Sequence, residues 1–184
     1  MPNNQLVHVI LLSTDALVLL GLVLFPSFDG PEGDFLKNEF LELEAYIPYR
    51  DQIRPEISKV DVAWHVDHSL RTINEVYKAM SQSNPEAYQS RIHIGRSLLI
   101  LMDRIPRGRA EAPEIVRPPE IIHTDSLHLM LALAQENLVR LDSLPEKAFF
   151  EHPYLGQLRR KTAKRFLEIH TNHHLKIIAD ILAK

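Results

Sequence analysis

A pair of histidines lies inside a strongly helical pattern near the end of this chain. Apolar residues recur from Phe166 to Ile178 with the period of an α-helix. His170 and His174 are four positions apart, so they lie one turn above the other on the apolar face. Burying two imidazoles without partners costs free energy, and a divalent metal ion is the simplest partner for both. The pattern therefore predicts a metal site inside a helical bundle.

Four further segments favour helices, and stretches rich in proline or glycine separate them. The predicted helices cover 34–47, then 58–81 with Ser58 as N-cap, a segment from Pro85 to before Pro106, 125–142 with Thr124 as N-cap, and about 159 to 184. No stretch alternates for long enough to predict a sheet. We expect an all-α fold, a bundle of four or five antiparallel helices.

The N-terminus carries a second strong signal. Leu6 to Phe25 spans about 20 residues, or roughly 30 Å as a helix, which matches a bilayer core. Asp15 costs about 3 kcal/mol on the insertion scale, and the fourteen Leu, Ile, Val and Phe residues return roughly 4 to 8 kcal/mol. No basic residue precedes Lys37, so the positive region of a cleaved signal peptide is missing. We expect an uncleaved single-pass membrane anchor, its orientation undetermined; an unusually apolar first helix of the bundle is the alternative.

Composition excludes several classes of function. The 184 residues carry a net charge of −3 and no basic run, which argues against nucleic-acid binding. The absence of cysteine excludes disulfides, zinc–thiolate sites and a cysteine nucleophile. We divide the chain into a transmembrane anchor (1–26), a linker with a short first helix (27–57) and a helical bundle (58–184).

A third metal ligand is expected from the helix at 58–81, which carries His65 and His68. On a helical wheel the apolar stripe of that segment centres about 60° from His65 and well over 100° from His68. His65 therefore borders the core, and the predicted ligands are His65, His170 and His174. His68 and His173 are expected to support the site or to serve a structural role.

Three imidazoles leave a coordination position open, as catalytic zinc, nickel, manganese or iron sites do. A water on that ion would be acidified and could act as a nucleophile. Asp61, Asp67 and Glu168 are candidates for the carboxylates that orient the imidazoles. A fourth ligand, for which His68 and His173 are the candidates, would close the site and favour a structural metal. A metal-free histidine cluster in a non-catalytic interaction protein is the further alternative.

The C-terminal motif resembles a known family. The segment Arg165 to Leu175, preceded by His152-Pro-Tyr-Leu-Gly-Gln-Leu158, resembles the end of the DUF1569 proteins of the DinB-like superfamily. There a His-Pro-aromatic-x-Gly loop leads into a helix with an Arg-Phe-x-x-x-His-x-x-His-His-Leu pattern. Ala63 to Val66 is similar to the part of the second helix that carries the family's histidine, which matches His65, with His68 as the alternative match. The resemblance covers roughly 58–183.

The resemblance implies a DinB-like four-helix bundle that holds a divalent metal ion (zinc, nickel or manganese) with three histidines. Some members of the superfamily are thiol transferases that use small thiol cofactors, others are hydrolases or isomerases, and some pair into homodimers. We therefore expect a membrane-anchored, metal-dependent hydrolase or thiol-dependent transferase that acts on a small-molecule substrate. The N-terminal apolar segment and the indistinct first helix depart from the family pattern.

Overall fold

The computed structural model of the chain describes residues 35–108 and 111–183. The predicted anchor at Leu6 to Phe25 lies outside these residues. Within the described part of the chain, no helix has both the length and the apolar character needed to cross a membrane. Residues Gly33–Lys184 form one compact unit.

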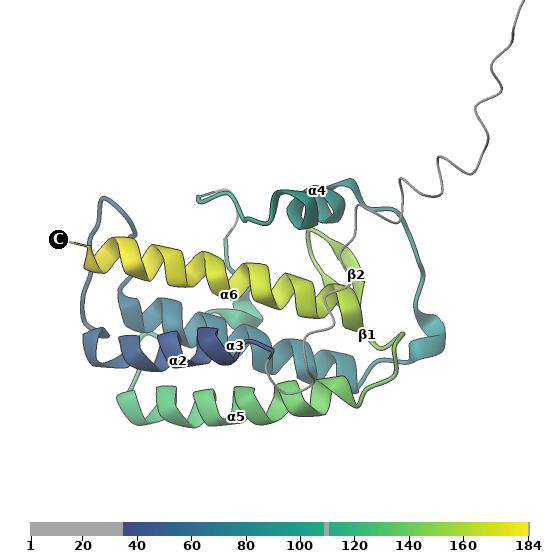
Figure 1. The fold of residues 1–184 in the computed structure, drawn as a ribbon, viewed down its shortest axis with the longest axis horizontal. Coiled ribbons are helices and arrows are strands. Elements are labelled where there is room, and N and C mark those ends of the chain that lie inside the picture. Colours follow the sequence, from purple (N-terminus) through teal and green to yellow (C-terminus); the bar gives the residue numbers. More distant parts are fainter. Residues whose placement is uncertain (1–34, 109–110, 184) are drawn as a thin grey trace, which may run out of the picture. The chain divides into compact units, whose positions relative to one another are not determined.

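Four helices lie side by side, and a fifth lies on the outside of the last one (Figure 1). The four are α2 (Lys37–Tyr46), α3 (Val62–Ser81), α5 (Thr124–Asp142) and α6 (Arg160–Leu182), and the outer helix is α4 (Ile94–Met102). The described connections contain three short 3-10 helices, at Ile47–Tyr49, Pro85–Ala87 and Glu114–Val116. The predicted helical bundle is therefore confirmed, although the helix expected between Pro85 and Pro106 is shorter than predicted.

The four bundle helices have the directions that an alternating five-helix order predicts, but the third expected helix lies outside the bundle. The chain runs one way through α3 and α5 and the opposite way through α2 and α6 (Figure 1). The long connection at 82–123, which includes α4, carries the chain back along the bundle before α5 begins. Because of this crossover, α3 and α5 are parallel neighbours, whereas α2 with α3 and α5 with α6 are antiparallel.

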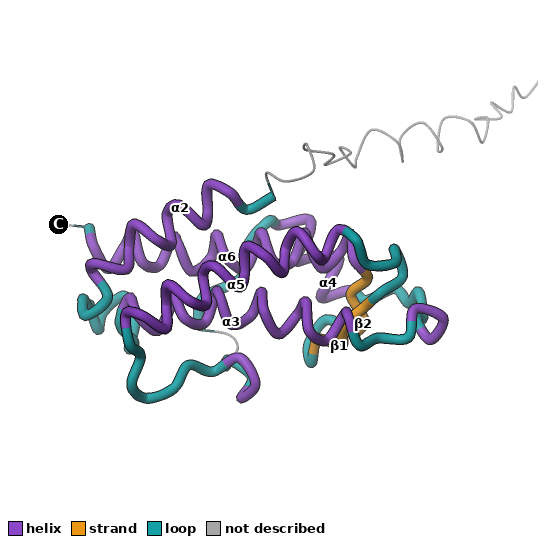
Figure 2. The backbone as a smooth tube through the Cα atoms, turned by 90° about the horizontal axis from the view of Figure 1, so that it is seen from below, coloured by secondary structure: helices purple, strands orange, loops and turns teal. Residues whose placement is uncertain are grey.

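A β-hairpin was not predicted. Strand β1 (Phe149–His152) pairs in antiparallel fashion with β2 (Gly156–Arg159), and Figure 2 shows the pair at one end of the bundle, beside the start of α6. The expectation of no sheet was wrong because four residues are too few to display an alternating pattern. Gly156 has a φ of 67°, a backbone conformation that glycine adopts without steric cost.

The core centres on α3, which packs against both α5 and α6. Its fully buried side chains Val62, Val66 and Leu70 belong to one hydrophobic core with apolar side chains of the neighbouring helices, among them Leu127, Leu141, Leu167 and Ile178. Helix α2 adds Phe40 and Leu43 to the same core, so residues from the stretch 27–57 also pack in the bundle.

The N-caps of α3 and α5 differ from those expected from the sequence. Asp61, and not Ser58, caps α3, since its carboxylate accepts a hydrogen bond from the Trp64 backbone N–H at 2.8 Å. Thr124 begins α5 without capping it, and its hydroxyl instead accepts from Arg50 Nη1 at 2.8 Å. Both N-cap predictions were therefore wrong.

Replacing Asp61 with alanine is expected to lower the free energy of unfolding by about 1 kcal/mol, because the Trp64 N–H loses its acceptor. Urea unfolding followed by circular dichroism measures the loss. Asp61→Asn, which keeps a side-chain oxygen, is the matched control and should retain most of the stability. Equal stability of Asp61→Ala and the unsubstituted protein would show that the cap contributes nothing.

Candidate metal centre

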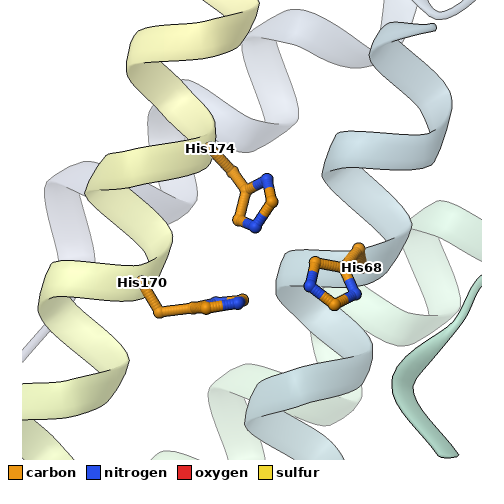
Figure 3. A group of neighbouring side chains, drawn as sticks. All are labelled: His68, His170 and His174. Atoms are coloured by element: carbon orange, nitrogen blue, oxygen red, sulfur yellow. The ribbon is translucent and has the colours of Figure 1, made fainter. Parts of the chain in front are cut away.

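Three buried histidines from two helices meet in the bundle. His68 comes from α3, and His170 and His174 come from α6, with all three rings pointing into the space between these helices (Figure 3). Each offers one ring nitrogen, and these nitrogens lie within 4.8 Å of one another. Among the described residues no fourth histidine or carboxylate belongs to this group. The arrangement can hold a metal ion through three imidazoles.

Helix geometry places the two histidines of α6. His170 and His174 lie one turn apart on the face that also buries Leu167 and Ile178. Their ring centroids are 4.7 Å apart. The His170 ring packs against Phe166, with a centroid distance of 5.4 Å. The inward face of α6 therefore brings both imidazoles to the α3 side of the core.

The His68 ring is held from two sides. Its Nδ1 lies 2.7 Å from the Val116 carbonyl oxygen, so Nδ1–H donates and Nε2 is left to bind an ion. The Trp64 ring stacks on it with a centroid distance of 4.8 Å and an interplanar angle of 25°. Val116 belongs to the 3-10 helix in the proline-rich connection, and that connection therefore orients a candidate ligand of the distant helix α3.

His65 lies behind His174. The two Nδ1 atoms are 2.9 Å apart, and His65 Nε2 lies 2.9 Å from the Ser58 hydroxyl. If His174 binds an ion through Nε2, its Nδ1–H donates to His65 Nδ1, and His65 Nε2–H then donates to Ser58. In this relay His65 orients a ligand. The structure thus groups His170 and His174 with His68, whereas the wheel grouped them with His65.

The wheel places His68 outward or toward a neighbouring helix, and the structure shows the second, because α3 has no single buried face. His65 and His68 are each only 4% exposed, and the polar side chains of Asp67, Ser69 and Thr72 on the same helix are also buried. Helix α3 contacts α5, α6 and the 3-10 helix at Glu114–Val116, which cover different sides of it. Angular distance from an apolar stripe predicts burial only when one side of a helix faces water.

The predicted carboxylates have other partners. Asp61 caps α3. Asp67 pairs with Arg71 through two contacts of 2.8 and 3.1 Å, and Glu168 accepts from Arg165 at 2.6 Å. In the described ranges, the groups that bond the candidate ligands are the Val116 carbonyl and the His65 imidazole. Neither partner was predicted. The position of the Val116 carbonyl, for example, depends on how a long loop folds back onto α3.

Burial sets the protonation of the cluster. Loss of solvent lowers the pKa of His68, and it lowers the pKa of His170 and His174 well below the usual value, with repulsion between neighbouring histidines as a smaller cause. The pKa of His65 falls to about 4, chiefly through burial. All four imidazoles are therefore neutral near pH 7, which is the form that binds metal ions.

His173 faces a different part of the surface. It lines a pocket of about 400 Å³ together with Ile169, Lys176 and the segment 103–107, and none of the three clustered histidines is among the lining residues. Burial, followed by the charge of Arg107, lowers the pKa of His173 to about 4. His173 is therefore not placed as a ligand, although its ring is a neighbour of His174, with centroids 5.1 Å apart.

A helical bundle does not by itself indicate a function, because this architecture supports many unrelated ones. Comparison of the chain with protein-family models, with curated proteins and with solved structures found no match. The function is therefore inferred from the three histidines and their surroundings.

Proposed function

We propose that this protein binds one divalent metal ion through His68, His170 and His174 and acts as a metal-dependent hydrolase or thiol-dependent transferase on a small molecule. The observation that carries the proposal is the set of three buried imidazole nitrogens within 4.8 Å of one another. Their lowered pKa values keep the rings neutral and ready to bind an ion.

The donor set fits such an ion. Imidazole nitrogens suit zinc and nickel and also occur in manganese and iron sites. Nitrogens bound to one tetrahedral zinc lie roughly 3.3 Å apart, given bonds of about 2.0 Å, so modest ring rotations would bring the three together. Three protein ligands leave a position for substrate, which is typical of catalytic sites. When bound, the ion would act as a Lewis acid and acidify a water or a thiol.

The resemblance to DUF1569 and other DinB-like proteins supports the finer parts of this proposal. It suggests a small thiol as a cofactor and a homodimer as the assembly. The apolar segment Leu6 to Phe25 supports a single-pass membrane location. These parts rest on sequence patterns, whereas the three-histidine group rests on the structure.

A closed structural metal site is the second candidate. His65 favours it, because its Nδ1 lies 2.9 Å from the Nδ1 of His174. A shift of the His65 ring would supply a fourth imidazole. A closed site would have no exchangeable position. The chain would then be a non-catalytic helical bundle that interacts with other molecules.

Cobalt(II) loading of the full chain in detergent tests both candidates. We expect about one ion per chain by elemental analysis, little in His170→Ala, and full loading in the control His128→Ala, which changes an exposed histidine of α5. Addition of a small thiol should shift the visible cobalt bands of an open site and leave a closed site unchanged. If the unsubstituted protein takes up no cobalt, zinc, nickel or manganese, the metal proposal is wrong. Hydrolase and thiol-transfer assays follow only if the bands shift.

A further inference from the structure

Helix α4 presents a continuous apolar face to solvent. No residue of this helix is buried. The α4 patch consists of side chains that are 46 to 96% exposed, namely Ile92, Ile94, Leu98, Leu101 and Met102. Ile94, Leu98 and Leu101 are spaced to lie on one side of the helix. Scattered exposed leucines are ordinary, but a contiguous group of this kind marks an interaction surface.

The helix is fixed to the bundle by its other side. Leu99 packs against the core, and Arg96 Nη1 donates to the Gln157 carbonyl of β2 at 2.7 Å. His93 caps the helix start by accepting from the Arg96 backbone N–H. Figure 1 shows α4 along the outside of α6. The α4 patch is thus held in a defined place.

Basic residues stand before and after this apolar face. The segment 88–107 contains four arginines (91, 96, 104 and 107) and one acidic residue, Asp103, in a chain whose net charge is −3. Two of the arginines have other partners, since Arg96 bonds the hairpin and Arg107 forms an ion pair with Asp180 at 2.7 Å. Arg91 precedes the helix and Arg104 follows it, and both are exposed. Arg104 also shares a pocket with Arg107 and Lys176 of α6. An apolar face between basic side chains is complementary to an anionic lipid surface.

We propose that α4 docks in the plane of an anionic membrane surface, with the α4 patch among the upper acyl chains and Arg91 and Arg104 at lipid phosphates. A second copy of the chain fits this face less well, because pairing two α4 helices about a two-fold axis would bring the basic ends together. This inference concerns a surface outside the three-histidine group and does not depend on metal binding.

Tryptophan placed on the patch tests the proposal with a signal that is specific to α4. The full chain carrying Leu101→Trp is reconstituted in vesicles of phosphatidylcholine, with or without phosphatidylglycerol. We expect blue-shifted emission and quenching by brominated acyl chains when phosphatidylglycerol is present. Leu129→Trp, at a 72% exposed site on α5, is the matched control and should show neither. The unsubstituted chain, whose one tryptophan is Trp64, gives the blank.

The other outcomes overturn the proposal. Equal behaviour at the two sites excludes docking through α4. A blue shift that brominated acyl chains do not quench and that grows with protein concentration indicates a second copy. An unquenched blue shift at every protein concentration indicates another segment of the same chain. In the Arg91→Gln/Arg104→Gln variant, the equilibrium constant for docking should fall about 25-fold and half-maximal quenching should need more phosphatidylglycerol, since each basic residue near the surface contributes a factor of about five. Lys161→Gln, which changes an exposed lysine of α6, is the control. A phosphatidylglycerol requirement in the arginine variant equal to that of this control would contradict the role of the arginines.

Discussion

Replacing His68 with alanine is expected to abolish stoichiometric metal binding, whereas replacing His65 should leave one ion per chain with an affinity lowered roughly 10- to 100-fold. The difference follows from their places in the structure. His68 contributes a nitrogen to the three-histidine group. His65 contacts that group through the Nδ1 of His174. Loss of His65 leaves the ligand set intact and removes only the partner that orients His174.

Elemental analysis gives the stoichiometry, and a titration followed through Trp64 gives the affinity. Trp64 is the one tryptophan of the chain, and its ring stacks on His68, so its emission should respond when an ion fixes that imidazole. His173→Ala is the matched control, because it removes a neighbouring histidine that lines the separate pocket. Stoichiometric metal in His68→Ala together with none in His65→Ala would establish the set predicted from the helical wheel instead. Circular dichroism verifies that each variant folds.

Acid is expected to unfold the metal-free protein between about pH 6.5 and pH 4. Burial lowers the pKa of His65 to about 4 and the pKa of His170 and His174 well below 6.5. The unfolded chain takes up protons at these histidines near pH 6.5, while the folded chain does not, so their contribution to stability is lost as the pH falls. Each such histidine reduces the unfolding free energy by about 1.4 kcal/mol per pH unit. Over this range His65 alone accounts for about 3 kcal/mol, against a typical total of about 5 to 15 kcal/mol.

Urea unfolding with a chelator present, at about pH 7.5 and about pH 5, measures this dependence. His170→Leu should show a smaller loss of stability between the two conditions, because it removes a buried group that must accept a proton on unfolding. His128→Gln replaces an exposed histidine, so it is the control for removing one histidine without changing the buried cluster. If His170→Leu and the unsubstituted protein lose the same free energy, the buried cluster does not set the acid sensitivity.

The sequence predicts helices best where the apolar period is long and clear. The segments expected at 58–81, 125–142 and from about 159 correspond to α3, α5 and α6. The hairpin was missed because its strands have four residues each. The place of α4 on the outside of the bundle was also not predicted, since it depends on how the whole connection at 82–123 folds.

The candidate site shows the same division between local and long-range information. The spacing of His170 and His174 predicts a shared face, and the structure places both rings together. The choice between His65 and His68 depends on contacts made far along the chain. The Val116 carbonyl that orients His68 is 48 positions away, and the His174 ring that contacts His65 is 109 positions away. A helical wheel for α3 contains neither contact.

The positions of the three histidines along the chain have a consequence for folding. His68 and His170 stand on either side of α4, α5 and the hairpin, so an ion bound to both would close a loop of about 100 residues. A covalent cross-link of that span stabilises a fold by up to about 5 kcal/mol in the chain-entropy model. In a chain without cysteine, the ion would thus act as a reversible cross-link between the first and second halves of the bundle. A chelator would then remove the bound ion and, with it, a cross-link that restricts the conformations of the unfolded chain.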